Sequence, residues 1–572
     1  MTKKNILYLM MFISTSSIFS QTTEKKFWLS GLSRGLFNID NINSMNDTIS
    51  LKKAEYGHTL VDLSANIKPN SNTYIRSSIR VRNEYGGFWG SGVTFDLREL
   101  YLRGLISNSI RYQIGDMDYK MTPFTFYNNS ERFYSNSLDI FGIYNNIIDY
   151  DNFYFDNNTW RQQGGAIDFS LSFNKNIDEM KFNFFTSRIN TSDFNSINDR
   201  IFFGTNISII QSEKLNLGLN YINLKDISGT SLNNNYYKNP VFTGTYNFTK
   251  KSEDFELNLK GESGFSNVDI ENTSEFEKLS DYFNYSKLTF KYLPLDLTFK
   301  FSYRNVGQNF RSVGSQMRRL NYSTQGYTFN RYTNDLVIRP IGIWDIYNDA
   351  SLFNNQIQVG LDNFYPQYNN IDPYGLSTPN RKGFNFELVN SNKHKKYDFT
   401  IYFNNLSEIV GVGTNNTRNY KTYGFNFNSN LANFMNFNKS LMLQLNYNFD
   451  KTKRNSNTPS DSYLKSNLNT SKLQIGLNYQ ISGDFYVISG YERICSSGKD
   501  HISIRNQYDQ INNLRYYETN LNEEIFGLGF EYKFDSKNNL KFIWQNYNWS
   551  DQLTLLPDYE FSRFSLIYIM KF

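Results

Sequence analysis

The chain has 572 residues, with 59 Lys and Arg against 54 Asp and Glu, which gives a formal net charge of +5. A balance this weak argues against nucleic-acid binding, and the single cysteine, Cys495, excludes a disulfide framework, cysteine-ligated iron–sulfur clusters and a cysteine-rich zinc site. After residue 20 the sequence lacks any run of the roughly 20 apolar residues that a membrane-spanning helix needs. The 43 Tyr and 50 Phe instead favour the half-buried surface of a β-sheet.

The N-terminus has the pattern of an export signal. Lys3 and Lys4 precede a non-polar run at Ile6–Ile13, and a Ser-rich stretch follows up to Ser20. This order of charged, apolar and small residues predicts a signal peptide over residues 1–20 that is cleaved after export. A membrane anchor is the alternative, but the second half of the segment is polar. Since no cysteine follows the apolar run, the segment is not a lipoprotein signal.

The remaining chain alternates apolar and polar residues at period two. In Leu295–Arg304, for example, Leu297 and Phe299 share one face, and Thr298 and Lys300 share the other. Recurrent segments of this kind, about ten residues long, are typical of the strands of transmembrane β-barrels. The same scheme recurs in Thr73–Tyr85, Phe255–Glu262, Leu441–Asp450, Leu473–Ile481 and Phe526–Phe534.

A soluble β-sandwich can also alternate, but a chain of this length would then need several separate cores. In a barrel each apolar face meets lipid, each polar face meets the lumen, and every backbone group pairs with a neighbouring strand. Because such barrels use even strand numbers, we predict an all-β, antiparallel up-and-down transmembrane barrel of about 20–22 strands. It forms a single domain over residues 21–572. Clear alternation starts near Thr59, and residues 25–58 are left as an early strand or a short lumenal segment.

The connections between the expected strands differ in length. Short turns are expected on the periplasmic side, and long polar loops on the extracellular side. The expected short turns are 292–294, 482–484 and 535–539, and the expected long loops are 119–162, 305–335, 450–471 and 498–522.

The C-terminal residues carry a sharper signal. Five residues fall on one face at period two, and the chain stops on the last of them: Phe564, Leu566, Tyr568, Met570 and Phe572. This pattern resembles the terminal strand signal of Gram-negative outer-membrane β-barrels, and the resemblance implies recognition by the barrel-assembly machinery and insertion into outer-membrane lipid. An ordinary edge strand is the alternative, but an exposed apolar edge would aggregate. In a closed barrel this strand pairs with the first one.

Candidate catalytic residues are scarce. The chain has three histidines, and their spacing does not match a metal site. His394 lies in a basic stretch that reads as a turn. Asp500, His501 and Ser503 form the one local grouping that a hydrolase could use, but a triad is recognised by geometry and not by sequence proximity. We therefore predict no enzyme activity, no metal and no cofactor.

Arginines suggest a lumenal function. If the polar faces line a pore, a positive ladder could favour anionic solutes through focused fields. The alternative is a solvated wall in which arginines pair with acids such as Asp96 and Glu99. The pore-lining candidates are Arg76, Arg80, Arg82, Arg98 and Arg111, with Arg103 nearby.

The segment Arg98–Gly104, followed by Tyr112–Asp116, resembles paired strands of porin-like and polysaccharide-export barrels. Asp116 departs from that pattern, because many porins have Arg there. In porins the long loop after such strands folds inward as a constriction. Here the segment Met121–Trp160 is rich in aromatics and Asn, which suit sugar rings, but we expect it to lie mainly outside as a surface loop.

These observations favour an outer-membrane channel for small polar or anionic solutes or saccharides. The alternative is a non-channel barrel that acts in an envelope assembly or secretion complex, or as a surface scaffold for envelope proteins. A TonB-dependent receptor is disfavoured, since such receptors resemble a barrel preceded by a large folded plug and alternation here begins too early for one.

Overall fold

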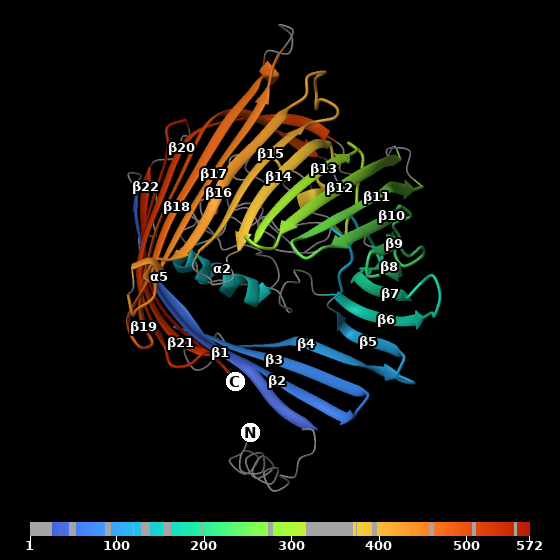
Figure 1. Cartoon of the computed structure of the whole chain (residues 1–572), viewed down its shortest axis with the longest axis horizontal. Helices are drawn as coiled ribbons and strands as arrows, with labels where there is room; N and C mark the ends of the chain where they lie inside the picture. Colours follow the sequence, from blue (N-terminus) through green and yellow to red (C-terminus); the bar gives the residue numbers. More distant parts are fainter. Residues whose placement is uncertain are drawn as a thin grey trace.

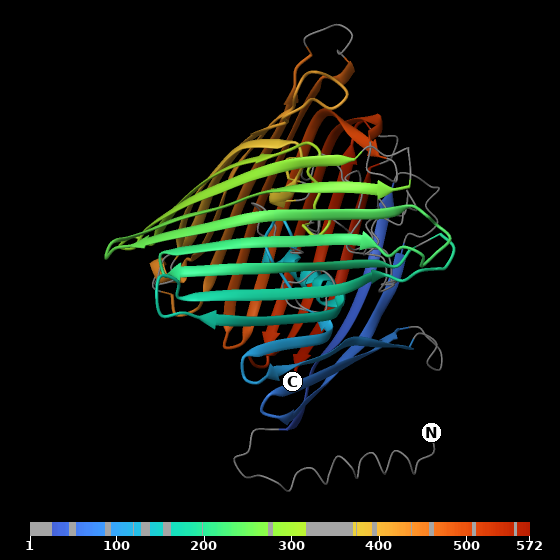
Figure 2. The same ribbon diagram turned by 90° about the vertical axis from the view of Figure 1, so that its right-hand side faces the viewer.

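The computed structural model describes residues 26–44, 53–85, 93–117, 119–126, 138–152, 162–196, 198–272, 278–315, 370–372, 375–391, 397–435, 437–456, 463–505, 511–553 and 558–572. They form a 22-stranded antiparallel sheet that closes on itself (Figures 1 and 2). The predicted all-β up-and-down barrel and its strand number are confirmed. The predicted signal peptide, residues 1–20, lies outside the described residues.

The strands follow one another around the wall in chain order. The first eleven are β1 (Phe27–Ser44), β2 (Lys53–Asn70), β3 (Thr73–Glu84), β4 (Val93–Ile106), β5 (Ile110–Met117), β6 (Gln162–Ser172), β7 (Glu179–Asn190), β8 (Arg200–Ser212), β9 (Leu215–Asp226), β10 (Tyr236–Lys251) and β11 (Phe255–Glu271). The others are β12 (Leu279–Tyr292), β13 (Leu297–Val306), β14 (Arg381–Ser391), β15 (Tyr397–Ser407), β16 (Asn419–Asn430), β17 (Leu441–Arg454), β18 (Ser466–Ser482), β19 (Phe485–Arg505), β20 (Ile511–Lys533), β21 (Asn538–Asp551) and β22 (Tyr559–Lys571). The helical elements are α2 (Asp139–Asn152), α5 (Ala432–Met435) and the 3-10 turn η2 (Gly375–Ser377). No helix in the described ranges is long and apolar enough to cross a membrane.

The barrel closes through β1 and β22, whose pairing runs from Leu32 opposite Lys571 to Ser44 opposite Tyr559. Inside this seam Arg563 donates to both carboxylate oxygens of Asp40, at 2.7 and 2.5 Å. The five C-terminal residues singled out above do share one face of β22, and that face points outward. The last strand therefore has a partner on each side, β21 and β1.

The two faces of the wall differ in chemistry as predicted. On β13 the outward Phe301 is 49% exposed, whereas the inward Arg304 is 5% exposed. Large apolar side chains are exposed around the whole outer surface, and Tyr85, Tyr303 and Tyr479 are among them. A soluble protein does not present such a continuous apolar surface. A closed barrel in lipid does, so the wall is that of an outer-membrane barrel.

Connection lengths alternate along the chain. Each link from an even-numbered to the next odd-numbered strand has two to ten residues, and the expected turns near 292–294, 482–484 and 535–539 are among them. The opposite links are longer in most cases, and the two longest join β5 to β6 and β13 to β14.

Two of the expected long loops were wrong in extent. The expected long loop 498–522 is mostly strand, and half of 450–471 is strand, because β17 to β20 continue well past the apolar segments. Beyond the lipid both faces of a strand meet water, so the hydropathy period disappears while the backbone ladder continues. Residues 25–58, which the sequence left as an early strand or a short lumenal segment, contain the early strand β1 and the start of β2.

Candidate lumenal site

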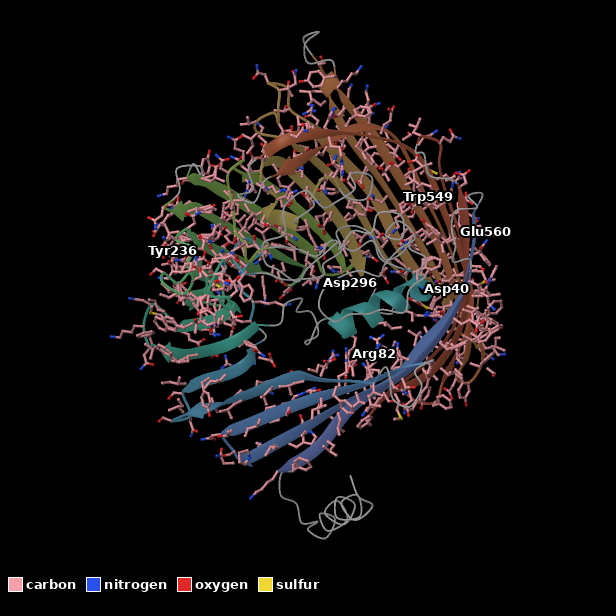
Figure 3. The ribbon with its side chains drawn as sticks, turned by 180° about the vertical axis from the view of Figure 1, so that it is seen from behind. Asp40, Arg82, Tyr236, Asp296, Trp549 and Glu560 are labelled. Carbon is pink, nitrogen blue, oxygen red and sulfur yellow. The ribbon has the colours of Figure 1, made fainter. Side chains whose placement is uncertain are left out.

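The predicted pore-lining arginines of β3 all lie on its inward face. Arg80 and Arg82 are buried and Arg76 is half-buried, whereas the intervening Ile79 is exposed on the outer face. Figure 3 shows Arg82 on the side of the wall that faces α2. The period-two pattern thus placed these three side chains correctly.

Arg98 reaches the interior by a different route. Ser78 pairs with Glu99 and Ile79 pairs with Leu97, so Arg98 is the extra residue of a β-bulge. Both Arg98 and Glu99 are buried, at 6% and 5% exposure, although adjacent residues of a regular strand point to opposite faces. The bulge also shifts the inward face of β4 from even-numbered to odd-numbered residues. The alternation of polar and apolar residues along β4 does not indicate this bulge, because a bulge is a register between two strands.

The inward arginines are matched with acids and carbonyls. Arg80 donates to both carboxylate oxygens of Asp62 at 2.8 Å, and Arg98 Nη1 lies 3.1 Å from the same carboxylate. Arg76 Nε lies 2.8 Å from Glu99 Oε2. These three arginines are therefore paired with acids, as the alternative of a wall with paired charges requires. An anion-selective arginine ladder stays a prediction.

The other two candidates lie farther apart. Arg82 Nη2 is 3.3 Å from His58 Nδ1, and both side chains are buried on the inner face of the wall. Arg111 lies near the short-turn end of β5, where its side chain is 70% exposed and its Nε is 2.6 Å from Asp168 Oδ1. The five predicted residues therefore form a belt along β3 to β5 and not a single cluster.

Helix α2 lies inside the ring of strands (Figure 1). Its apolar side chains, with Leu138 before it, pack in one buried cluster against the inner faces of β19 to β22 and β1. Glycines provide the room, because a Cβ on Gly490 would lie 2.7 Å from Ile140 Cγ2, and one on Gly527 would lie 2.9 Å from Ile140 Cδ1. The helix is thus seated closely against the backbone of the wall.

The other end of α2 is tied to a second part of the wall. Tyr150 Oη donates to Asp62 at 2.5 Å, its carbonyl accepts from Arg98, and the Arg98 guanidinium lies 4.0 Å from its ring centroid. The helix therefore bridges the lumen from β19 and β20 to β2 and β4.

The segment before α2 also folds inward. Phe124 stacks on Phe283 of the inner wall at 4.0 Å between ring centroids, and Phe126 packs on Phe185 and Phe202. Thr122 Oγ1 donates to Glu262 at 2.6 Å. The expectation that 121–160 is mainly a surface loop is thus wrong for its described parts, because burying these aromatic rings outweighs solvating them.

The long link between β13 and β14 is held inside at both described ends. Ser312 donates to the Thr125 carbonyl at 3.2 Å. At the other end Arg304 pairs with Asp372, and Arg381 donates to the Ile371 carbonyl at 2.9 Å. Burial raises the pKa of Asp372 above its ordinary value, and the neighbouring Arg304 and Arg381 oppose that rise.

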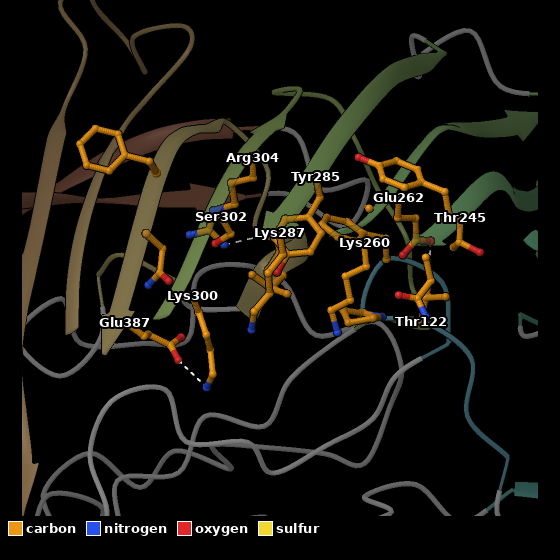
Figure 4. A pocket seen from close by; sticks show the side chains of 18 of the residues that line it. Thr122, Thr245, Lys260, Glu262, Tyr285, Lys287, Lys300, Ser302, Arg304 and Glu387 are labelled. Atoms are coloured by element: carbon orange, nitrogen blue, oxygen red, sulfur yellow. Dashed lines mark hydrogen bonds and ion pairs between the residues drawn. The ribbon is translucent and has the colours of Figure 1, made fainter. Parts of the chain in front are cut away.

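A cavity of about 540 Å³ lies between these inward segments and the wall formed by β8 to β15. A volume of this size falls within the range of small-molecule sites. Figure 4 shows the ammonium groups of Lys260, Lys287 and Lys300 directed toward the same open region. Lys300 Nζ bonds to Glu387 at 2.9 Å, and this is the one ion pair between wall strands drawn there.

The charged residues that line the cavity number four cations and three acids. The cations are Lys260, Lys287, Lys300 and Arg304, and the acids are Glu262, Asp372 and Glu387. Hydroxyl and amide groups alternate with them, including Ser302, Asn385 and Asn404. The sequence analysis did not identify this site, because its residues come from eight strands and two inward segments that only closure of the barrel brings together.

The histidine grouping is engaged in buried contacts. Asp500 accepts from Arg418 Nε at 2.8 Å, from Ser466 at 2.6 Å and from Asn370 at 2.6 Å. His501 Nδ1 lies 3.5 Å from Arg454 Nη2. His394 lies outside the described residues. Within the described ranges no group of three or more His, Cys, Asp or Glu side chains could hold a metal ion.

No protein-family model and no curated protein matches the sequence. Among solved structures, the chain is similar to Pseudomonas aeruginosa OccK9 (OpdG), at 8% identity over 96% of this chain and 99% of that one, with a TM-score of 0.35. A BenF-like porin from Pseudomonas fluorescens Pf-5 gives 10% identity, the same coverages and a TM-score of 0.35. Pseudomonas aeruginosa OccK2 (OpdF) in complex with glucuronate is 11% identical over 96% of this chain and 100% of that one, with a TM-score of 0.35. Such distant superpositions leave the fold resting on this chain's own strand pairing.

Proposed function

We propose that this protein is an outer-membrane channel for small polar solutes, with a preference for anions and saccharides. The observation that carries the proposal is the lining of the lumenal cavity. It has four cationic side chains against three acidic ones, together with hydroxyl and amide groups. Cations in a water-filled passage with low-dielectric walls raise the local concentration of anions. Hydroxyl and amide groups can replace the hydration of a sugar as it passes.

The inward segments make the passage narrow. Helix α2 crosses the lumen, and residues 119–126 and 370–372 cover part of the inner wall. A channel built this way should conduct weakly and should select by size as well as by charge. The same filling of the lumen is what a non-channel scaffold would show, so electrical measurement decides between the two functions.

Planar-bilayer recording of the purified protein tests the proposal. We expect discrete conductance steps and, in a potassium chloride gradient, a reversal potential that indicates preference for chloride. Lys260→Glu should move that potential toward cation preference, because Lys260 faces the cavity. Lys214→Glu, in the exposed turn between β8 and β9, is the matched control and should leave it unchanged. A folded barrel that stays electrically silent at all voltages would support the scaffold function.

A further inference from the structure

The inner wall carries a second cluster of ring and cation side chains, away from the cavity. It consists of Trp28 on β1, Tyr74 on β3, and Tyr101 and Arg103 on β4, and we call it the rim platform. Tyr74 pairs with Arg103, one residue from the last pair of the β3–β4 register, Thr73 opposite Gly104. The platform therefore lies at the short-turn end of the barrel, which is the periplasmic end.

The rings of the platform are arranged in a row. The centroids of Trp28 and Tyr74 are 5.8 Å apart with 29° between the planes, and those of Tyr74 and Tyr101 are 5.9 Å apart. Tyr74 Oη donates to Asn66 Oδ1 at 2.6 Å, and Asn66 Nδ2 donates to Ser30 Oγ at 2.9 Å. Trp28 and Tyr74 are only half-buried, so these hydrogen bonds hold an aromatic surface open to the lumen.

The cation of the platform is oriented by the same rings. The Arg103 guanidinium carbon lies 4.7 Å from the Tyr74 centroid and 5.4 Å from the Tyr101 centroid. Arg103 is exposed and forms no salt bridge within 4.0 Å among the described residues. The nearby Glu99 attracts it electrostatically but is bonded to Arg76 at 2.8 Å. Stacking against a ring leaves the N–H edge of a guanidinium available for a planar carboxylate.

We propose that the rim platform is a solute-binding site for a ring that bears a carboxylate, with the ring on Trp28 and Tyr74 and the carboxylate on Arg103. Aromatic faces bind sugar and aromatic rings, and the guanidinium fork matches the two carboxylate oxygens. The cavity is lined by other strands, β8 to β15, so the platform is a separate site. This inference rests on the proposed channel function, because the platform then lies where solutes leave the lumen.

Direct binding to the detergent-solubilised barrel tests the platform independently of transport. Isothermal titration should show binding of glucuronate, weaker binding of glucose, which lacks the carboxylate, and weaker binding of acetate, which lacks the ring. Arg103→Gln should weaken glucuronate about tenfold or more, because it removes hydrogen bonds to a charged group. Trp28→Leu should weaken glucuronate and glucose alike. Lys214→Gln, in the exposed turn between β8 and β9, is the control and should leave glucuronate binding unchanged.

Glucuronate block of single channels supplies the second readout. Arg103→Gln should shorten the blocked intervals by a similar factor while the open conductance stays near that of the parent protein. A barrel that conducts but shows no dependence of binding on Arg103 and Trp28 would overturn the platform and leave the channel. A barrel that binds through Arg103 but never conducts would overturn the channel and leave the platform.

Discussion

Replacing Gly490 and Gly527 together by valine should lift α2 off the wall and enlarge the conductance. Neither glycine has a positive φ, so both backbones can accept a β-branched residue. The new side chains would meet Ile140, which is 2.7 Å from the Cβ position of Gly490 and 2.9 Å from that of Gly527. Gly490 pairs with Gly527 across β19 and β20, so two valines would crowd different branches of the same Ile140 side chain, and its rotation could not relieve both contacts.

The size of the effect follows from the packing. Leu138, Ile140 and Phe141 are essentially inaccessible in this cluster, so the site has little space to absorb added atoms. Overpacking a buried position costs about 1–3 kcal/mol, or about 2–6 kcal/mol for the two sites together. With about 1.4 kcal/mol for each factor of ten, the ratio of docked to released helix should fall by between about 30-fold and about 20,000-fold.

Single-channel recording in planar bilayers measures the outcome. We expect the double variant to show larger steps or frequent transitions to a more conducting level. Gly244→Val on β10 is the matched control, because a Cβ there has no neighbour closer than 3.9 Å. If the double variant folds, as judged by its β-type circular dichroism, and conducts as the parent protein does, then α2 does not limit the passage and the bridging role assigned to it is wrong.

Three further predictions concern the wall. Asp40→Asn should lower the free energy of unfolding in lipid vesicles by about 3–5 kcal/mol, because it leaves the buried Arg563 charge without its carboxylate; the added change Arg563→Met should recover part of the loss. Phe572→Ala should slow insertion into vesicles that carry the barrel-assembly machinery while leaving final stability nearly unchanged, because the backbone of Phe572 still pairs with Gly31 at 2.9 and 3.1 Å; equal insertion rates would contradict its role as a signal. Hydrogen bonds from the backbone of Lys537 and Asn538 hold the pKa of Asp535 below its usual value, so the stability that this turn contributes should be present above about pH 3.9 and should be lost as the pH falls through the lower folded-state value. Hydrogen exchange at the turn measures this, and Asp535→Asn should abolish the dependence.

Much of the barrel could be predicted from local pattern alone. A side chain that must face lipid or lumen repeats at period two, and this constraint acts on every strand separately. It placed Arg76, Arg80 and Arg82 on the inward face, and it placed the C-terminal residues from Phe564 to Phe572 on the outward face. Strand closure followed, because an apolar last strand needs a partner.

The period-two pattern failed in two situations. One is where a strand extends beyond the lipid, and the other is where one extra residue exchanges the inward and outward positions of the residues that follow. Strands β19 and β20 continue beyond the lipid, so their outer halves have lost the hydropathy signal. The bulge at Arg98 moves Arg103 onto the inward face, although simple alternation places these two residues on opposite faces. A bulge is a choice of hydrogen-bond register between two strands, and neither strand alone encodes it.

The lumen itself was decided by tertiary structure. The glycines that receive α2 come from β19 and β20, hundreds of residues after the helix, and the cavity joins Lys260 to Glu387 across strands that meet only in the closed wall. The sequence determined on its own that a wall would form and which side chains would face lipid, because that depends on neighbours two residues apart. Which segments fill the lumen depends on surfaces that are far apart in the chain, and these become neighbours only when the sheet closes.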